Sequence, residues 1–182
     1  MEITLTLNGE ETTFAGIGSE SLLDVLRRSG HTGTKRGCNT GDCGFCTVIV
    51  DGQPIKSCLE PAIRSDGVDV ETIEGLGTQD ELHPIQAAFV DNAALQCGFC
   101  IPGMIMRTKA LLESNPDPTA AEIRAGLSGN LCRCTGYEKI LVAVDDAASR
   151  MADETGLAAD GGRLGGSQSC SSCDCDFGGG PE

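Results

Sequence analysis

Cysteine is the residue type with the clearest capacity for chemistry in this chain of 182 residues, which contains 11 of them. Four lie within the stretch KRGCNTGDCGFCTVIVDGQPIKSC, at Cys38, Cys43, Cys46 and Cys58. Four others form a CxxC and a CxC that are far apart in the chain, at Cys97, Cys100, Cys132 and Cys134. Thiolates are ligands for soft metals, so two metal centres are the first hypothesis.

The first group has the spacing C-x4-C-x2-C, followed by a fourth cysteine after eleven intervening residues. This is the plant-type ferredoxin pattern for a 2Fe-2S cluster, in which a tight loop brings three thiolates to one small inorganic core. Gly37, Gly41 and Gly44 would permit positive φ angles and a close approach of backbone N–H groups to sulfur. Structural zinc is the alternative, although its sites usually contain two short CxxC-like pairs.

In the second group, neither the CxxC nor the CxC can complete a four-coordinate centre, but together they supply four thiolates. Both pairs lie at or just before the start of a predicted helix, where free N–H groups and the helix dipole favour negative charge. The pattern therefore predicts a second cluster that forms when the helices pack together. A zinc site or two buried pairs of structural cysteines are the alternatives.

The elements that must position these cysteines divide the chain into two parts, which predicts the α+β class. Residues 1–76 alternate in hydrophobicity like strands, with hairpin signals at Asn8-Gly9 and Asp51-Gly52. SLLDVLRRSG interrupts them with a helical pattern that Ser19 or Ser21 can cap. The predicted order is strand, strand, helix, strand, strand, strand, the last at residues 68–73.

Residues 77–152 have helical patterns, and four helices are enough for a small bundle. Pro84 suits a first helical turn after His83, Thr119 and Glu122 form a capping box, and the last helix begins near Tyr137. From residue 153 the composition changes to Gly, Ser and Asp, which predicts a disordered extension. This extension, residues 153–182, has a C-x2-C-x-C motif that could instead bind a further metal or act in redox chemistry, at Cys170, Cys173 and Cys175.

Composition excludes several classes of function. The formal net charge is -14 with only four Lys residues, which argues against a nucleic-acid partner because a phosphate backbone requires a basic surface. No stretch resembles a signal peptide or approaches membrane-spanning length, so a cytoplasmic protein with reduced thiols is expected. A secreted disulfide framework would be smaller and would usually have an even number of cysteines.

Three motifs, GCNTGDCGFCTV, LQCGFCIPGM and SGNLCRCTGY, in this order and at these separations, resemble the small iron-sulfur subunit of the xanthine oxidase family of molybdenum hydroxylases. The resemblance covers about residues 1–150. It implies an N-terminal β-grasp ferredoxin-like domain and a helical-bundle domain, each with one 2Fe-2S cluster. It also implies a large partner subunit that binds molybdopterin and a medium partner subunit that binds FAD.

The resemblance further implies roles for single residues. Gln96 of QCGFC would hydrogen-bond to the pterin, and Cys134 of CRCTGY would be the cluster ligand nearest to it. Electrons would pass from molybdenum through the second cysteine group to the first and then to FAD, after water-dependent hydroxylation of a heterocycle or an aldehyde in another subunit. Ile101 stands where many relatives have Thr.

No catalytic acid, base or nucleophile is predicted in this chain. His31 and His83 are expected to be a loop residue and a helix cap. Two other classes of function are possible: a freestanding ferredoxin with two clusters, and a zinc-binding adaptor.

Overall fold

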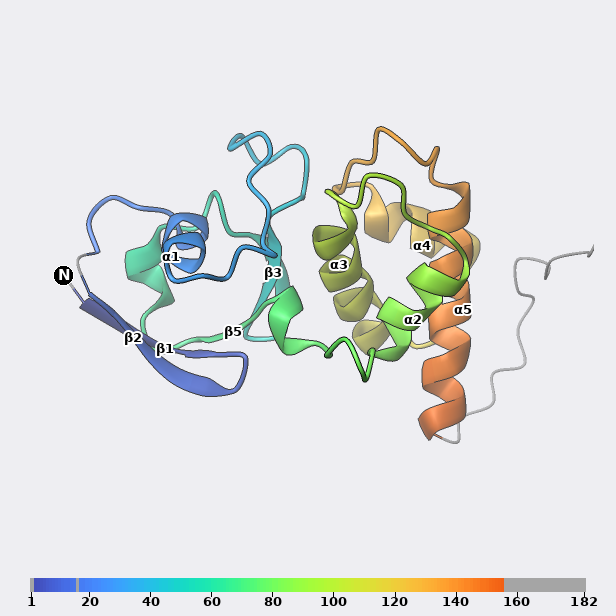
Figure 1. Ribbon diagram of the computed structural model, residues 1–182, viewed down its shortest axis with the longest axis horizontal. Helices are drawn as coiled ribbons and strands as arrows, with labels where there is room; N and C mark the ends of the chain where they lie inside the picture. Colours follow the sequence, from blue (N-terminus) through green and yellow to red (C-terminus); the bar gives the residue numbers. More distant parts are fainter. Residues whose placement is uncertain (1, 16, 156–182) are drawn as a thin grey trace, which may run out of the picture.

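The computed structural model describes residues 2–15 and 17–155, which form a sheet followed by a group of helices (Figure 1). The sheet has five strands: β1 (Glu2–Leu7), β2 (Glu10–Ala15), β3 (Thr47–Val50), β4 (Gln53–Lys56) and β5 (Asp69–Glu71). Their order is β2-β1-β5-β3-β4, with β1 and β5 parallel and the other neighbours antiparallel. The predicted order of strands and helix is confirmed.

Both predicted hairpins are present, and each turns through two residues with positive φ. The angles are 52° at Asn8 and 85° at Gly9 in the first, and 47° at Asp51 and 75° at Gly52 in the second. Positive φ at both central residues gives a turn whose twist matches that of the strands. β5 is shorter than the predicted 68–73, and it ends early because Thr72 caps a 3-10 helix, η2 (Ile73–Gly75).

Helix α1 (Leu22–Arg28) covers the sheet, and its N-cap is Ser21. The Ser21 side chain accepts a hydrogen bond from the Asp24 backbone, while the Asp24 carboxylate accepts one from the Ser21 backbone. This reciprocal capping box fixes the helix start. A short 3-10 helix, η1 (Ala62–Ser65), packs on α1 and β1. The sheet core contains Ile3, Leu5, Leu7, Phe14, Ile17, Leu22, Val25, Leu26, Val48, Ala62 and Val70.

The helical part consists of α2 (Pro84–Asp91), α3 (Ile101–Ser114), α4 (Ala120–Leu127) and α5 (Glu138–Thr155). His83 caps α2, and the predicted Thr119–Glu122 capping box begins α4. α2 packs on α5, α3 packs on α4, and α4 packs on α5 around the buried Phe89 and Met104. No helix within the described ranges is long and apolar enough to cross a lipid bilayer.

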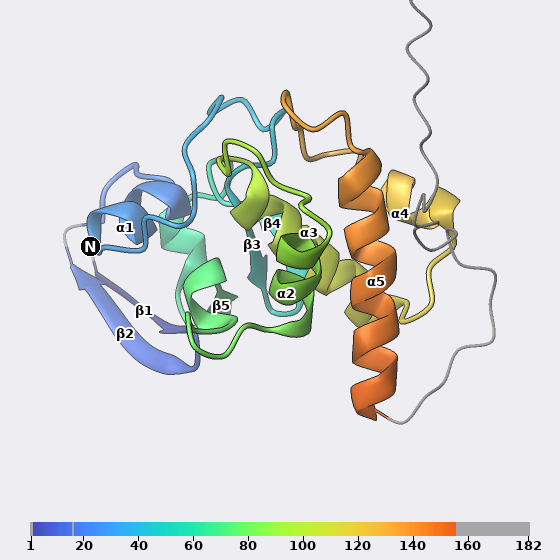
Figure 2. The same cartoon turned by 45° about the vertical axis from the view of Figure 1, so that its right-hand side comes forward.

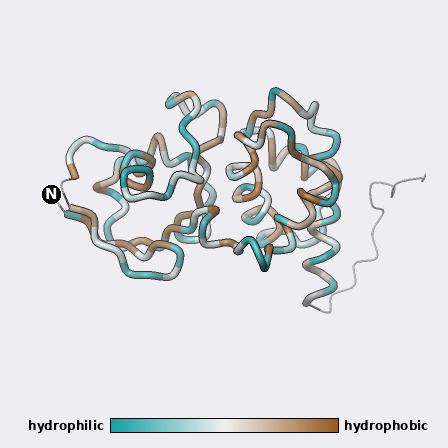
Figure 3. Tube along the Cα trace, viewed as in Figure 1, coloured by the Kyte–Doolittle hydropathy of each residue, from teal (hydrophilic) through white to brown (hydrophobic). Residues whose placement is uncertain are grey.

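The two parts are joined by packing as well as by the chain. α3 lies against β3 and β4, where Ile49, Met106 and Ala110 form a small buried cluster (Figures 1 and 2). The Lys109 ammonium forms an ion pair with the Glu71 carboxylate at 2.8 Å across the same seam. The connecting chain before α2 is polar and is drawn largely in teal at the lower centre of Figure 3, between the two parts. A buried apolar seam with an ion pair beside it holds the parts in one arrangement.

Candidate metal centres

The loop before β3 positions the first three cysteines through close backbone approaches. Glycine is required at Gly37, because a Cβ there would lie 2.7 Å from the Cys43 Sγ and closer still to the Phe45 ring. Asn39, Gly41 and Gly44 have positive φ angles of 59°, 83° and 71°. The loop is therefore wound tightly around the sulfur atoms, as its glycine content predicts.

The fourth cysteine of this group, Cys58, returns to the loop from the end of β4. The Ser57 N–H and hydroxyl donate to the Cys46 carbonyl at 3.2 and 2.7 Å, which places Cys58 beside Cys46. Burial and contact with the Cys46 thiol raise the pKa of Cys58 to about 11. The structure thus brings the predicted first group together.

Cys38 has the opposite electrostatic environment. The backbone N–H groups of Thr40 and Cys43 both donate to its Sγ at 3.4 Å. Hydrogen bonds from Thr40 and from Cys43 lower the pKa of Cys38 to about 6, because they stabilise its thiolate. The loop is therefore already arranged to hold a negatively charged sulfur.

The second group is brought together from two separate segments, one before α3 and one before α5. The Sγ atoms of Cys97 and Cys134 are 3.6 Å apart although the residues are 37 positions apart in the chain. Cys100 and Cys132 are in contact as well, and burial together with this contact raises the pKa of Cys100 to about 12. The CxxC and the CxC therefore meet in the fold, as the sequence predicts.

A side-chain hydroxyl stabilises one sulfur of this group. Burial opposes ionisation of Cys132, but the Thr135 hydroxyl donates to its Sγ at 3.1 Å, and the pKa of Cys132 is lowered overall. Contact with Cys97 raises the pKa of Cys134, since two neighbouring thiolates would repel one another. Without a bound cation, the group cannot easily ionise all four sulfurs.

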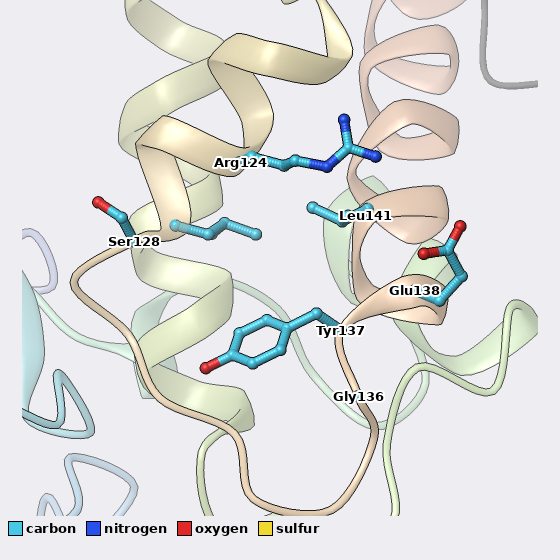
Figure 4. Close-up of a pocket in the computed structure, with 7 residues that line it drawn as sticks. Arg124, Ser128, Gly136, Tyr137, Glu138 and Leu141 are labelled. Atoms are coloured by element: carbon cyan, nitrogen blue, oxygen red, sulfur yellow. The ribbon is translucent and has the colours of Figure 1, made fainter.

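Tyr137 holds the loop between Cys132 and α5. Its hydroxyl accepts a hydrogen bond from the Cys132 backbone N–H at 2.8 Å and donates to the Asn130 carbonyl at 3.2 Å. Figure 4 shows its ring extending from the start of α5 towards the loop that follows Ser128, along a pocket of about 410 Å³. Tyr137 also has a positive φ of 71°, which a non-glycine residue adopts only when its surroundings impose it.

The two cysteine groups are joined directly, and their loops lie on the same side of the molecule (Figures 1 and 2). The Leu131 N–H donates to the Cys43 carbonyl at 2.8 Å, so a neighbour of Cys132 bonds to a residue of the first group. The buried Asn130 donates to the Gly44 carbonyl at 2.8 Å and to the Thr47 hydroxyl at 3.2 Å. Few atoms therefore separate the two groups.

The sulfur atoms of both groups lie in contacting pairs that would suit the two irons of a 2Fe-2S cluster. Within residues 2–15 and 17–155, no three Cys, His, Asp or Glu side chains are placed to share one metal ion. The contacts run in pairs instead: Cys38 with Cys43, Cys46 with Cys58, Cys97 with Cys134, and Cys100 with Cys132. A 2Fe-2S cluster has two irons that share four thiolates, so each iron takes a pair. A metal would also offset the burial and the contacts between neighbouring thiols that raise several of the thiol pKa values.

Other predicted residues have the following positions. Gln96 is exposed next to Cys97, and Leu95, Phe99 and Leu131 are exposed large apolar side chains in the same two segments. Ile101 begins α3. His31 is a loop residue and His83 a helix cap, as predicted. Cys170, Cys173 and Cys175 lie outside the described residues.

Sequence reasoning did not identify three residues that organise the second group: Asn130, Thr135 and Tyr137. All three lie within the motif SGNLCRCTGY, at positions between or beside the ligand candidates. A serine, threonine or asparagine next to a metal-binding cysteine is a signal for hydrogen bonding to sulfur or to the ligand loop. That signal could have selected Asn130 and Thr135, but it does not apply to Tyr137.

Two 2Fe-2S family models match the chain, in agreement with these two sites. A 2Fe-2S iron-sulfur cluster binding domain matches residues 5–71, and a [2Fe-2S] binding domain matches residues 72–145. The fold and the paired cysteines thus define an iron-sulfur protein with two cluster-binding domains.

Several known proteins are similar to this chain over most of its length. The nicotinate dehydrogenase small FeS subunit of Eubacterium barkeri is 46% identical over 152 residues, which cover 83% of this chain and 97% of the relative. The xanthine dehydrogenase iron-sulfur-binding subunit of Escherichia coli O157:H7 is 43% identical over 79% of this chain and 92% of the relative. In the crystal structure of quinoline 2-oxidoreductase from Pseudomonas putida 86, a 44% identical chain superposes with a TM-score of 0.81, covering 87% of this chain and 98% of that one. The chain belongs to the small iron-sulfur subunits of the xanthine oxidase family of molybdenum hydroxylases.

Proposed function

We propose that this chain is the electron-transfer subunit of a molybdenum hydroxylase. The observation that carries the proposal is the hydrogen bond from the Leu131 N–H to the Cys43 carbonyl, because it joins the two cysteine groups directly. When bound, each 2Fe-2S cluster would supply storage for one electron. The chain itself contributes the positions of the ligands, the hydrogen bonds to their sulfur atoms and the short separation between the sites.

The ligand assignment follows the pairs of sulfurs. Cys38, Cys43, Cys46 and Cys58 would hold one cluster, and Cys97, Cys100, Cys132 and Cys134 would hold the other. Support comes from the contacts within each group and from the positions of both groups in the matched cluster-binding domains. Thr135 would hydrogen-bond to a ligand of the second cluster, and hydrogen bonds of this kind raise the reduction potential.

The domain assignment has three parts. Residues 1–76 would form a β-grasp ferredoxin-like domain, residues 77–152 a four-helix-bundle domain, and residues 153–182 an extension. The order of the strands and the packing of α2 to α5 support the first two. The matched regions divide at nearly the same place, between residues 71 and 72.

The partners would be a large molybdopterin-binding subunit and a medium FAD-binding subunit, in a cytoplasmic complex. The second cysteine group would face the pterin. Cys97 and Cys134 are exposed there, together with Gln96, whose amide would hydrogen-bond to the pterin. The substrate would be a heterocycle or an aldehyde, chosen by the large subunit. The relatives named for nicotinate and xanthine dehydrogenases support the heterocycle.

Purification of the full chain from cells that express its neighbouring genes tests this function. We expect co-purification with a larger molybdenum-containing subunit, about four irons per copy of this chain and two distinct 2Fe-2S signals in electron paramagnetic resonance after reduction. Four irons without any partner would indicate a freestanding ferredoxin. Zinc in place of iron would indicate an adaptor and overturn the proposal.

A further inference from the structure

A second pocket, of about 240 Å³, opens at the seam between the sheet and the helical part. Lys56 at the end of β4 lines one side, and Arg107 of α3 lines another. Ser128, Gly129 and Asn130 of the loop after α4 complete it. The pocket therefore touches both halves of the molecule, beside the loop that connects the two cysteine groups.

The charge of this pocket is unusual for a chain whose formal net charge is -14. Its two charged lining residues, Lys56 and Arg107, are both cations, and no carboxylate lines it. Neither cation has an ion pair among residues 2–15 and 17–155. By contrast, Lys109 of the same helix is paired with both Glu71 and Glu113.

Arg107 is anchored by a hydrogen bond, and Lys56 lies beside the loop after α4. The Arg107 Nε donates to the Gly126 carbonyl at 2.6 Å, which anchors the guanidinium at the end of α4. The Lys56 amine lies over Gly129, since a Cβ on that glycine would lie 3.7 Å from the Lys56 Nζ. Two half-buried cations thus line the pocket without a carboxylate among its lining residues, and a bound anion would supply the counter-charge.

We propose that this pocket binds one small oxyanion, a phosphate or a carboxylate, between Lys56 and Arg107. The volume is below that of typical sites for larger ligands, roughly 300–1,000 Å³, so a nucleotide is too large. The guanidinium and the ammonium together match the oxygens of such an anion. The bound anion would fasten β4 to α3 and would steady Asn130, which lines the same pocket.

Thermal unfolding of the full chain with its clusters tests binding of free phosphate. At a phosphate concentration about ten times the dissociation constant, we expect the Tm to be roughly 3–6 °C higher than in sodium chloride of equal ionic strength. The rise should saturate and should disappear in Lys56→Gln and in Arg107→Gln. Lys139→Gln is the matched control, because Lys139 is exposed on α5 and does not line the pocket.

A second measurement distinguishes a free anion from a carboxylate of a partner subunit. Lys56→Glu and Arg107→Glu should weaken co-purification with the partner subunits at least tenfold if a partner carboxylate fills the pocket, whereas Lys139→Glu should not. The iron content of each variant is measured as well, so that loss of a cluster is not mistaken for loss of the anion site. If phosphate stabilises no more than chloride and charge reversal leaves the complex intact, the proposal is wrong.

Discussion

The two cysteine groups differ in how much of the fold each one needs. Three cysteines of the first group lie within nine residues, and a hairpin of the same sheet brings back Cys58. The second group is assembled from segments on either side of α3 and α4, with Cys97 and Cys134 meeting across 37 positions. The first site is thus largely a local structure, whereas the second exists only when the helices have packed. Stability of the helical part and occupancy of the second site should therefore be coupled.

The groups also differ in the source of the hydrogen bonds to sulfur. At Cys38 the backbone N–H groups of Thr40 and Cys43 donate at 3.4 Å, in addition to the Thr40 side chain, which contributes most to the lowered pKa of this thiol. At Cys132 a side-chain hydroxyl, that of Thr135, donates. Exchange of Thr135 therefore removes the hydroxyl donor to Cys132, whereas exchange of Thr40 would leave both backbone donors to Cys38 in place.

Removal of one buried ligand candidate from each group should have the largest effect. Cys100→Ser should abolish the second cluster and Cys46→Ser the first, so that each variant retains about two of about four irons. Iron analysis and electron paramagnetic resonance of the purified variants measure this. Cys170→Ser is the matched control, and a loss of iron from it would assign a metal to the C-terminal motif. Four irons in the Cys100→Ser variant would contradict the assignment.

Gly44→Ala should break the junction between the two sites. Gly44 has a positive φ, and a Cβ there would lie 2.4 Å from the Gly129 carbonyl oxygen, which cannot move far. We expect the free energy of unfolding to fall by about 2–4 kcal/mol.

Chemical denaturation monitored by cluster absorbance measures the Gly44 effect. Gly67→Ala is the matched control, because Gly67 has a φ of 76° but a Cβ added there would meet open space. We expect its free energy of unfolding to fall by only about 1 kcal/mol. Equal losses in both variants would show that strain alone, and not the close approach of the loops, accounts for the change.

Thr135→Val should make the reduction potential of the second cluster more negative, because the valine cannot donate to the Cys132 sulfur. Thr135→Ser keeps the hydroxyl and should keep a potential close to that of the original chain. A redox titration followed by electron paramagnetic resonance separates the two clusters. The reduction potential of the first cluster should stay constant in both variants. An equal shift in the reduction potentials of both clusters would indicate a general structural change.

Asp24→Asn should have the smallest effect and should depend on pH. Hydrogen bonds with Ser21, together with the neighbouring Arg36, lower the pKa of Asp24 from 3.8 to about 2, so its ionised form stabilises the fold. This contribution is fully present above pH 3.8 and is lost as the pH falls towards 2. Because the Asp24 side chain is 37% exposed, we expect Asp24→Asn to lower the free energy of unfolding by only about 1 kcal/mol at pH 7.

Denaturation of the original chain and of Asp24→Asn at pH 7, 5 and 3.5 measures this dependence. The difference in free energy of unfolding should be the same at pH 7 and 5 and smaller at 3.5. A difference that grows on acidification would contradict the assigned direction of the pKa shift. The site affected is the start of α1, which supports the first loop through the ion pair between Asp24 and Arg36.

Local signals in the sequence determined much of this protein. Asn8-Gly9 and Asp51-Gly52 predicted their hairpins because only such residues accept positive φ at both turn positions, and Thr119 and Glu122 predicted the start of α4. The spacing of Cys38, Cys43 and Cys46 predicted the first group for a similar reason, since neighbouring residues must form the loop. The sequence also predicted correctly that the two pairs of the second group lie close together in space. The role of all eight cysteines as ligands stays a prediction.

Only the tertiary structure decided the features that depend on distant parts of the chain. The bond from Asn130 to Gly44, the contact of Leu131 with Cys43 and the pocket between Lys56 and Arg107 join residues that are about 50 to 90 positions apart. Sequence periodicity reports which face of an element is apolar, but it does not report which loop each helix end will meet. Which loops meet follows from the packing of α3 against β3 and β4. The apolar seam around Met106 fixes the two halves of the molecule relative to each other, and this sets the separation of the two cysteine groups.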